Sequence, residues 1–173
     1  MIPASEEIFK TYYNSPVGLL EIQGTETYLS SISFVSKGQD RRTPPFVIQK
    51  CIRQLEEYFQ GKRTEFSLEI KMEGTEFQKQ VWNELQSIKF GKTLSYIELA
   101  RRLNQPLAVR AVGTANSRNP FPIIYPCHRV IGSNGSLIGY GGGLKRKQWL
   151  LGHERKCTGN YQLSLFDQAP SLV

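Results

Sequence analysis

A proline-rich segment, Asn119–Val130, constrains the fold of this chain more than any other stretch of its sequence. Pro120, Pro122 and Pro126 cannot donate a backbone hydrogen bond, and each holds its own φ near a single value. We therefore expect a stiff, extended connector here rather than a helix. Because the connector ends in Pro126-Cys-His-Arg-Val130, it predicts a cysteine presented at a fixed orientation rather than a thiol that only fills the core.

The chemistry expected at Cys127 depends on groups that lower its pKa or accept its proton, since a thiol reacts as the thiolate. His128 is adjacent, and Arg129 and the positive charge of this part of the chain also help. Neighbouring side chains of an extended segment point to opposite faces, so His128 can assist only if the backbone turns there or a water bridges the two groups. Glu154, the only acidic residue between positions 98 and 167, is the candidate that orients His128.

The sequence argues against a metal or a nucleotide in this region. Cys127, His128, His153 and Cys157 are possible zinc ligands, but no Cys-x-x-Cys pair exists, and adjacent residues chelate a metal poorly. The run Gly139–Gly143 lacks the Gly-Lys-Ser/Thr ending of a phosphate-binding loop. We expect no metal and no cofactor.

The positive charge lies in one part of the chain. The 173 residues carry a net charge of +7, with 9 Lys/Arg against 10 Asp/Glu in residues 1–74 and 13 against 4 in residues 75–156. A basic segment around a reactive cysteine favours nucleic acid as the partner over a surface that is basic only for solubility. Three widely spaced cysteines, with no signal sequence and no membrane-length apolar run, predict a cytoplasmic protein.

Residues 1–73 are expected to form a small α+β scaffold domain. Polar and apolar residues alternate over 9–36 with two interruptions, which predicts two or three antiparallel strands. Apolar residues at helical spacing over 48–59 predict a helix that ends at Gly61, with Cys51 in the core. A further strand is expected over residues 66–70.

Residues 74–156 are expected to form a mostly helical domain of the helix-turn-helix, winged-helix-like kind. Thr75-Glu-Phe-Gln78 and Ser95-Tyr-Ile-Glu98 have the spacing of capping boxes, and Pro106 suits the first turn of a third helix that runs to about residue 116. Asn134-Gly135 predicts a hairpin over 130–138, and a basic amphipathic helix is expected over 144–156.

The third helix carries the small residues Ala111, Gly113 and Thr114 between Arg110 and Arg118. Short side chains allow a helix backbone to approach a groove in DNA, and they also allow tight packing against another helix. The basic charge of this segment favours the first interpretation.

Several of these motifs together resemble one family. They are Arg110-Ala-Val-Gly113, Asn119-Pro120, Pro126-Cys-His-Arg-Val130, Tyr140-Gly-Gly-Gly143 and the helix around 149–154, and in this order they resemble the bacterial type of alkylguanine-DNA alkyltransferase, a family of direct-reversal repair proteins. The resemblance is strong over residues 74–156 and rests on the strand pattern alone before them. It implies a monomer that acts on double-stranded DNA containing alkylated guanine.

The resemblance also implies roles for individual residues. Cys127 would accept the alkyl group, His128 and Glu154 would form a water-bridged relay that removes its proton, and Tyr96 would protonate the departing guanine and help to rotate its phosphate. Arg110 would fill the space that the flipped nucleotide leaves.

Other residues would bind the DNA or line the pocket. The remaining DNA-binding positions would be Ala111, Gly113, Thr114 and Asn119, the last as a hinge that braces the helix-turn-helix. Backbone carbonyls of Cys127 and Val130 would bind the guanine amine, and Tyr140, Gly141 and Lys147 would complete the pocket. Some members carry serine where this chain has Gly141, so the resemblance implies room for bulkier alkyl groups.

The chemistry implied is a single transfer for each protein molecule. The target base must leave the duplex before a buried nucleophile can reach it. The product is a thioether, whose carbon–sulfur bond the pocket is not expected to hydrolyse. Two binding-only alternatives remain open: a lesion-recognition protein of the same fold, although those members usually replace the cysteine, and a helix-turn-helix regulator that senses alkylation through its thiol.

Residues 157–173 are expected to be a flexible tail. Gln162-Leu-Ser-Leu-Phe166 resembles the short peptide by which bacterial replication and repair proteins bind the sliding clamp, so Gln162, Leu163, Leu165 and Phe166 are its candidate clamp contacts. The alternative is that these apolar residues pack on their own domain.

Overall fold

The structure, a computed structural model, describes residues 7–39 and 42–159. In chain order the elements are β1 (Phe9–Ser15), β2 (Gly18–Gly24), β3 (Leu29–Phe34), α1 (Phe46–Phe59), α2 (Glu76–Leu85), β4 (Leu94–Ser95), α3 (Tyr96–Arg102), α4 (Val109–Ser117), the 3-10 helix η1 (Cys127–Arg129), β5 (Val130–Ile131) and α5 (Leu144–Cys157). This is the α+β fold that the sequence predicts.

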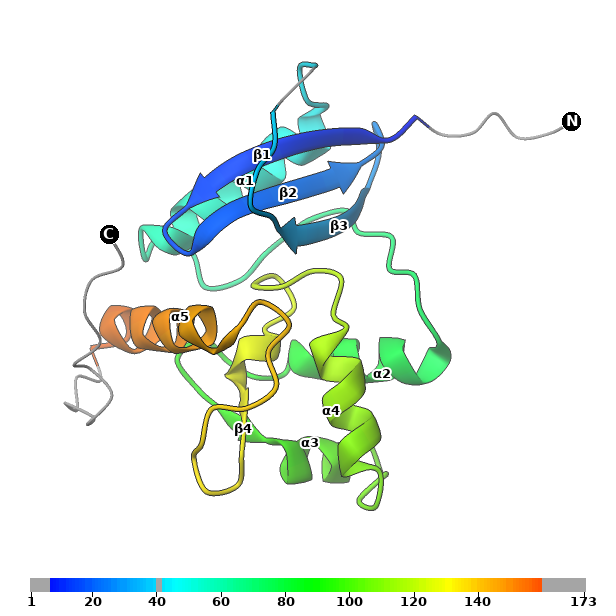
Figure 1. Cartoon of the computed structure of the whole chain (residues 1–173), viewed down its shortest axis with the longest axis vertical. Coiled ribbons are helices and arrows are strands. Elements are labelled where there is room, and N and C mark those ends of the chain that lie inside the picture. The colour runs from blue at the N-terminus through cyan, green and yellow to red at the C-terminus, as the bar shows by residue number, and fades with distance from the viewer. Residues whose placement is uncertain (1–6, 40–41, 160–173) are drawn as a thin grey trace, which may run out of the picture.

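The first unit is an antiparallel sheet in the order β1-β2-β3 with α1 across one face (Figure 1). Alternation along the strands turns Leu20, Ile22 and Ile32 inward, and all three are buried. Cys51 on α1 is buried with them, and this confirms its assignment to the core.

The strand expected over residues 66–70 does not form. Only Ile70 pairs with Leu29, in an isolated parallel bridge. The side chain of Gln54 accounts for this, because it donates to the carbonyl of Ser67 and accepts from its N–H, each at 2.9 Å. When a side chain already binds the N–H and carbonyl of a residue, those groups cannot pair with a neighbouring strand.

The second unit contains α2 to α5, and α2 and α3 begin directly after the capping residues that the sequence predicts. Thr75 and Gln78 form the complete capping box, whereas Ser95 accepts from the N–H of Glu98 without the reciprocal bond. The helix expected from Pro106 begins only at Val109, because the preceding residues form turns.

The hairpin expected over residues 130–138 does not form either. A turn does form at Asn134-Gly135, closed by the N–H of Gly132 donating to the carbonyl of Ser136 at 2.9 Å. However, β5 pairs in parallel with β4, Leu94 opposite Val130, instead of with the residues after the turn. This pairing joins the segment that follows Cys127 to the start of α3.

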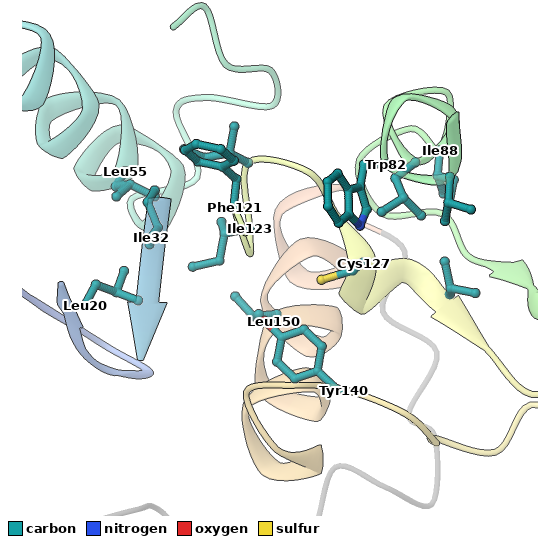
Figure 2. Packing of buried hydrophobic residues seen from close by; sticks show 14 of the residues in the cluster. Leu20, Ile32, Leu55, Trp82, Ile88, Phe121, Ile123, Cys127, Tyr140 and Leu150 are labelled. Carbon is teal, nitrogen blue, oxygen red and sulfur yellow. The ribbon is translucent and has the colours of Figure 1, made fainter. Parts of the chain in front are cut away.

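The two units share a continuous core, and Figure 2 shows residues of both, from Leu20 and Leu55 to Cys127 and Leu150. Figure 1 places α5 and the loop before η1 on the side of the helical unit that faces the sheet. The N–H of Ile32 donates to the carbonyl of Pro120 at 2.8 Å, and Arg146 donates to the carbonyl of Val17 at 2.7 Å. The segment leading to Cys127 is therefore held from both sides. Within residues 7–39 and 42–159, no helix has both the length and the apolar character to cross a bilayer.

Candidate active site

The segment that leads to Cys127 is turned rather than extended. The N–H of Tyr125 donates to the carbonyl of Phe121, Ile123 has a left-handed φ of 74°, and Cys127 begins η1. The φ that proline fixes is as compatible with turns as with extended chain, so the prolines alone did not decide the conformation. The expected extended connector does not form, and the backbone instead presents Cys127 by folding back on itself.

Asn119 holds this turn closed. Its Nδ2 donates to the carbonyl of Tyr125 at 2.7 Å, and its Oδ1 accepts from the N–H of Phe121 at 2.9 Å. The side chain thus replaces backbone partners that a strand would have supplied. It joins the end of α4 to the segment before Cys127.

Cys127 lies in the core with only 3% of its surface exposed. Figure 2 shows it with Trp82 on one side and Leu150 and Tyr140 on the other. Burial raises the pKa of the thiol to about 11, although Asn119 and the ammonium of Lys147 oppose that rise. The positive surroundings expected from the sequence are present, but desolvation outweighs them, and the thiol is protonated at neutral pH.

His128 and Glu154 are brought together as expected, with Nε2 of His128 2.7 Å from Oε1 of Glu154. Both side chains are completely buried. A carboxylate only accepts hydrogen bonds, so Nε2 carries the hydrogen and Nδ1 has a free lone pair. Within the described part of the chain, Nδ1 has no hydrogen-bond partner. Burial lowers the pKa of His128, against the opposing effect of Glu154, and this favours the neutral base.

Arg129 was expected only to add positive charge near Cys127, but in the structure it binds the Glu154 carboxylate. Its Nε lies 2.9 Å from Oε2 of Glu154, its Nη2 lies 3.0 Å from Oε1, and its Nη1 donates to the carbonyl of Ile88. Burial raises the pKa of Glu154, but His128 and Arg129 together bring it well below its usual range. Glu154 is therefore an anion paired with Arg129. A buried carboxylate needs a cationic partner, and this requirement was the one signal by which Arg129 could have been assigned to Glu154 from the sequence.

The same carboxylate receives two further donors. Tyr58 of α1 donates from its hydroxyl to Oε1 at 2.8 Å, and the N–H of Gly91 donates to Oε2 at 3.0 Å. The sequence predicts only a scaffold over residues 1–73, yet one of their side chains, that of Tyr58, reaches the charged centre of the site. The apolar spacing of α1 identifies Tyr58 only as a core position.

Lys147 and Tyr96 fasten the loop after the Asn134-Gly135 turn. The buried ammonium of Lys147 donates to the carbonyls of Val130 and Ile138 at 2.5 and 2.6 Å, and the Tyr96 hydroxyl lies 2.9 Å from the carbonyls of Ile138 and Gly139. Burial lowers the pKa of Lys147 to about 8 and raises that of Tyr96 to about 12. Gly139 has a φ of 61°, and a Cβ there would lie 2.8 Å from the Tyr96 hydroxyl, so glycine is required.

Tyr140 lies beside Cys127, and its ring packs edge-on against Phe34 of β3. Burial raises the pKa of Tyr140 far above its usual value, so it is a neutral wall of the site. Gly141 is exposed, and a Cβ there would meet the carbonyl of Ser117 at 2.7 Å. Its lack of a side chain thus accommodates the end of α4, and the contacts give no support to a link with alkyl size.

α4 presents two different faces. Arg110, Ala111 and Thr114 are exposed, whereas Val112, Ala115 and Asn116 are buried. Trp82 donates to the carbonyl of Ala115 at 2.8 Å, so close packing explains the small residue at that position. The exposed small residues have no such explanation, and they leave a low, basic surface open to a partner.

Asn116 is a further residue to which the sequence alone assigns no role. It is fully buried, and its Nδ2 donates to the carbonyl of Cys127 at 3.3 Å. The carbonyls of Cys127 and Val130 thus each have an internal donor, Asn116 for one and Lys147 for the other. A carbonyl has two lone pairs, so the Val130 carbonyl can accept a second hydrogen bond, whereas the Cys127 carbonyl already accepts a second one from the N–H of Val130.

Two further features of the sequence are the possible metal ligands and the candidate clamp peptide. No group of three or more potential metal ligands occurs in the described ranges. His153 and Cys157 approach to 3.9 Å on α5, on a different helix from Cys127. The candidate clamp residues Gln162, Leu163, Leu165 and Phe166 lie outside the described residues.

Comparisons with known proteins find matches to both parts of the chain. Residues 8–72 match the ribonuclease-like domain of 6-O-methylguanine DNA methyltransferase, and residues 76–156 match its DNA-binding domain. The chain is 45% identical over 159 residues to a methylated-DNA--protein-cysteine methyltransferase of Mycolicibacterium paratuberculosis, covering 89% of this chain and 96% of the relative. It is 42% identical over 156 residues to the protein of the same name from Methanosarcina acetivorans, covering 87% and 100%.

A solved structure of Mycobacterium tuberculosis OGT in complex with DNA has the same fold. It matches with a TM-score of 0.79 and 42% identity over 86% of this chain and 94% of that one. The sequence resemblance, the family models and the fold therefore agree: this chain belongs to the 6-O-methylguanine DNA methyltransferase family.

Proposed function

We propose that this protein repairs DNA by direct reversal, moving a methyl or other alkyl group from the 6-oxygen of guanine to Sγ of Cys127. The reaction makes it a methylated-DNA--[protein]-cysteine S-methyltransferase, the activity for which its relatives are named. The observation that carries the proposal is a buried thiol followed directly by a buried histidine, whose Nε2 is held by Glu154 and whose Nδ1 has no hydrogen-bond partner among the described residues.

The transfer requires two proton movements. The thiol proton passes through a bridging water to Nδ1 of His128, and Glu154 stabilises the imidazolium that forms. Sγ then attacks the alkyl carbon, the carbon–oxygen bond breaks, and its electron pair leaves with the guanine. Tyr96, protonated at neutral pH, gives up its bonds to the loop carbonyls and donates to the guanine ring.

The substrate reaches this site by base flipping. In our proposal α4 lies in a groove of the duplex with Ala111, Gly113 and Thr114 against it, and Arg110 occupies the place of the extruded nucleotide. Asn119 links that helix to the active-site turn. The guanine amine is bound by the carbonyls of Cys127 and Val130, while Tyr140, Gly141 and Lys147 surround the base.

This chemistry sets how the protein works in a cell. An S-alkyl cysteine is a thioether without an activated carbonyl, so water cannot release it and each molecule acts once. We propose a cytoplasmic monomer without a cofactor, in which residues 1–73 support the catalytic domain at 74–156.

Mass spectrometry after incubation with a duplex containing 6-O-methylguanine tests the proposal. We expect one added methyl on Cys127 and none on the exposed Cys157. Cys127→Ala should bind the duplex without an adduct, and Cys157→Ser should react like the wild type. Repair of many lesions per molecule, or intact binding with an unmodified Cys127, would contradict transfer and would favour a lesion-binding or alkylation-sensing protein.

For the tail we propose that Gln162-Leu-Ser-Leu-Phe166 docks on the bacterial sliding clamp. A variant with Gln162→Ala, Leu163→Ala and Phe166→Ala should keep the methyl transfer rate and lose clamp binding in a pull-down with purified clamp. Ser171→Ala, in the same tail, is the control. Equal clamp binding by the triple variant and the control would remove this proposal.

A further inference from the structure

Tyr58 connects the sheet-containing unit to the charged centre of the site. It is completely buried at the end of α1, and its hydroxyl donates to Oε1 of Glu154 at 2.8 Å. The same oxygen accepts from Nε2 of His128 at 2.7 Å. Tyr58 and His128 therefore share one acceptor atom, although they are 70 residues apart and belong to different units.

The position of this hydroxyl is fixed by its surroundings. The Tyr58 ring packs at centroid distances of 5.2 to 5.8 Å against Phe59, Phe66, Phe90 and His153. The ring nitrogen Nε2 of His153 lies 2.8 Å from the backbone carbonyl of Tyr58, so the residue is attached to α5 at both ends. A donor held this rigidly needs little reorganisation when the charge nearby changes.

We infer that Tyr58 is a positioning residue of the proton relay, whose hydroxyl holds Glu154 in place and limits how strongly that carboxylate binds His128. The inference rests on the proposed function. Tyr58 touches neither the thiol nor the base, and it acts only through Glu154.

The sign of its effect follows from the shared oxygen. Each donor to Oε1 withdraws electron density, so removing Tyr58's hydrogen bond strengthens the bond from His128 and favours the imidazolium. The pKa of His128 then rises. Since the relay needs neutral His128, the rate rises with pH through that pKa, and a higher pKa moves the acid limb of the rate profile to higher pH.

Other ionisable groups face the same cluster and must be constant in the comparison. They are Arg129 from η1, Lys147, His153 and Glu154 from α5, and Tyr140 from the preceding loop. A change confined to the Tyr58 hydroxyl leaves all of these side chains in place, and of them only Glu154 loses a hydrogen bond to it. The phenol itself stays neutral, because burial and then the charge of Glu154 raise its pKa well above the usual value.

The test is the pH dependence of the single-turnover rate of Cys127 methylation by methylated duplex. Tyr58→Phe keeps the ring and removes the hydroxyl. We expect its acid limb to move up by about half a pH unit, which is a loss of about threefold in rate below the limb and little change above it. Tyr13→Phe, which removes another hydroxyl from the same unit beside Phe59, should leave the limb unchanged.

A second variant makes the test independent of any folding defect. Fluorotyrosine at position 58 keeps the hydroxyl and makes it a stronger donor, so the acid limb should move to lower pH. A purely structural role for Tyr58 would alter the rate equally at every pH and would give no opposite shift.

The outcomes separate this inference from the proposed function. If the wild type forms no adduct on Cys127, the proposed function fails. If the wild type forms the adduct and the acid limbs of Tyr58→Phe and the fluorotyrosine protein coincide with it, only the role of Tyr58 is overturned.

Discussion

The Glu154 carboxylate gathers donors from residues that the chain order separates widely. Arg129 neutralises its charge, His128 and Tyr58 share one of its oxygens, and the N–H of Gly91 binds the other. A buried ion pair adds little net stability, but removing one partner leaves an uncompensated charge in the core. At the scale of single residues, we therefore expect Glu154 to contribute to the stability of the fold as well as to the proposed relay.

Glu154→Gln is expected to lower the free energy of unfolding by about 3 kcal/mol, because buried Arg129 then has no carboxylate. Urea denaturation at pH 7 measures this loss. Glu98→Gln is the control, since Glu98 is half-exposed at the start of α3 and makes only surface ion pairs, so that change should cost less than about 1 kcal/mol. Similar losses in the two variants would show that the buried pair has no special weight.

At the scale of elements, α4 divides its small residues between two tasks. Ala115 and Asn116 face inward, where they contact Trp82 and the carbonyl of Cys127, and Arg110, Ala111 and Thr114 stay exposed. One helix thereby joins an open basic surface to the backbone of the reactive cysteine. A substitution on the exposed face should change the handling of duplex DNA without changing the thiol chemistry.

Arg110→Ala is expected to slow methyl transfer from duplex DNA by about tenfold, since the space left by the flipped base is no longer filled. Transfer from the free alkylated base should fall by less than twofold, by the same reasoning. Rates with the two substrates provide the measurement, and Arg53→Ala, an exposed arginine of α1, is the control. Equal losses with both substrates would exclude an intercalating role for Arg110.

At the scale of the whole molecule, the two units are held together at the site itself. The contacts from Ile32 to Pro120, from Val17 to Arg146 and from Tyr58 to Glu154 all cross between them. Buried titratable groups at such a junction make global stability depend on pH, because the unfolded chain exposes them to water.

Stability is expected to fall on acidification in two stages. The folded pKa of His128 lies below its ordinary 6.5 and that of Glu154 lies below its ordinary 4.5, so the unfolded chain binds protons more readily than the native protein. The free energy of unfolding should be highest above pH 6.5, fall below it, and fall further below 4.5. Urea titrations at a series of pH values provide the measurement. In Glu154→Gln the second stage should disappear, and its persistence would assign that stage to other carboxyl groups.

Local patterns in the sequence predicted several of the strands and helices and the family of this protein. The alternation over residues 9–36, the caps at Thr75 and Ser95 and the helical spacing of α1 depend on neighbours within a few positions, and these elements form as expected. The family could also be identified from local patterns, namely the motif around Cys127 and the run Arg110-Ala-Val-Gly113. Each is a short run whose residues must act together.

Only the tertiary structure decided features that depend on distant partners. Whether residues 66–70 and 130–138 pair as strands depended on Gln54 and β4, and whether the prolines extend or turn depended on Asn119. Arg129 and Tyr58 became site residues because the fold brings both to one carboxylate. Sequence spacing does not predict these contacts, because the partners of a buried charge are the groups that the fold brings close to it in space.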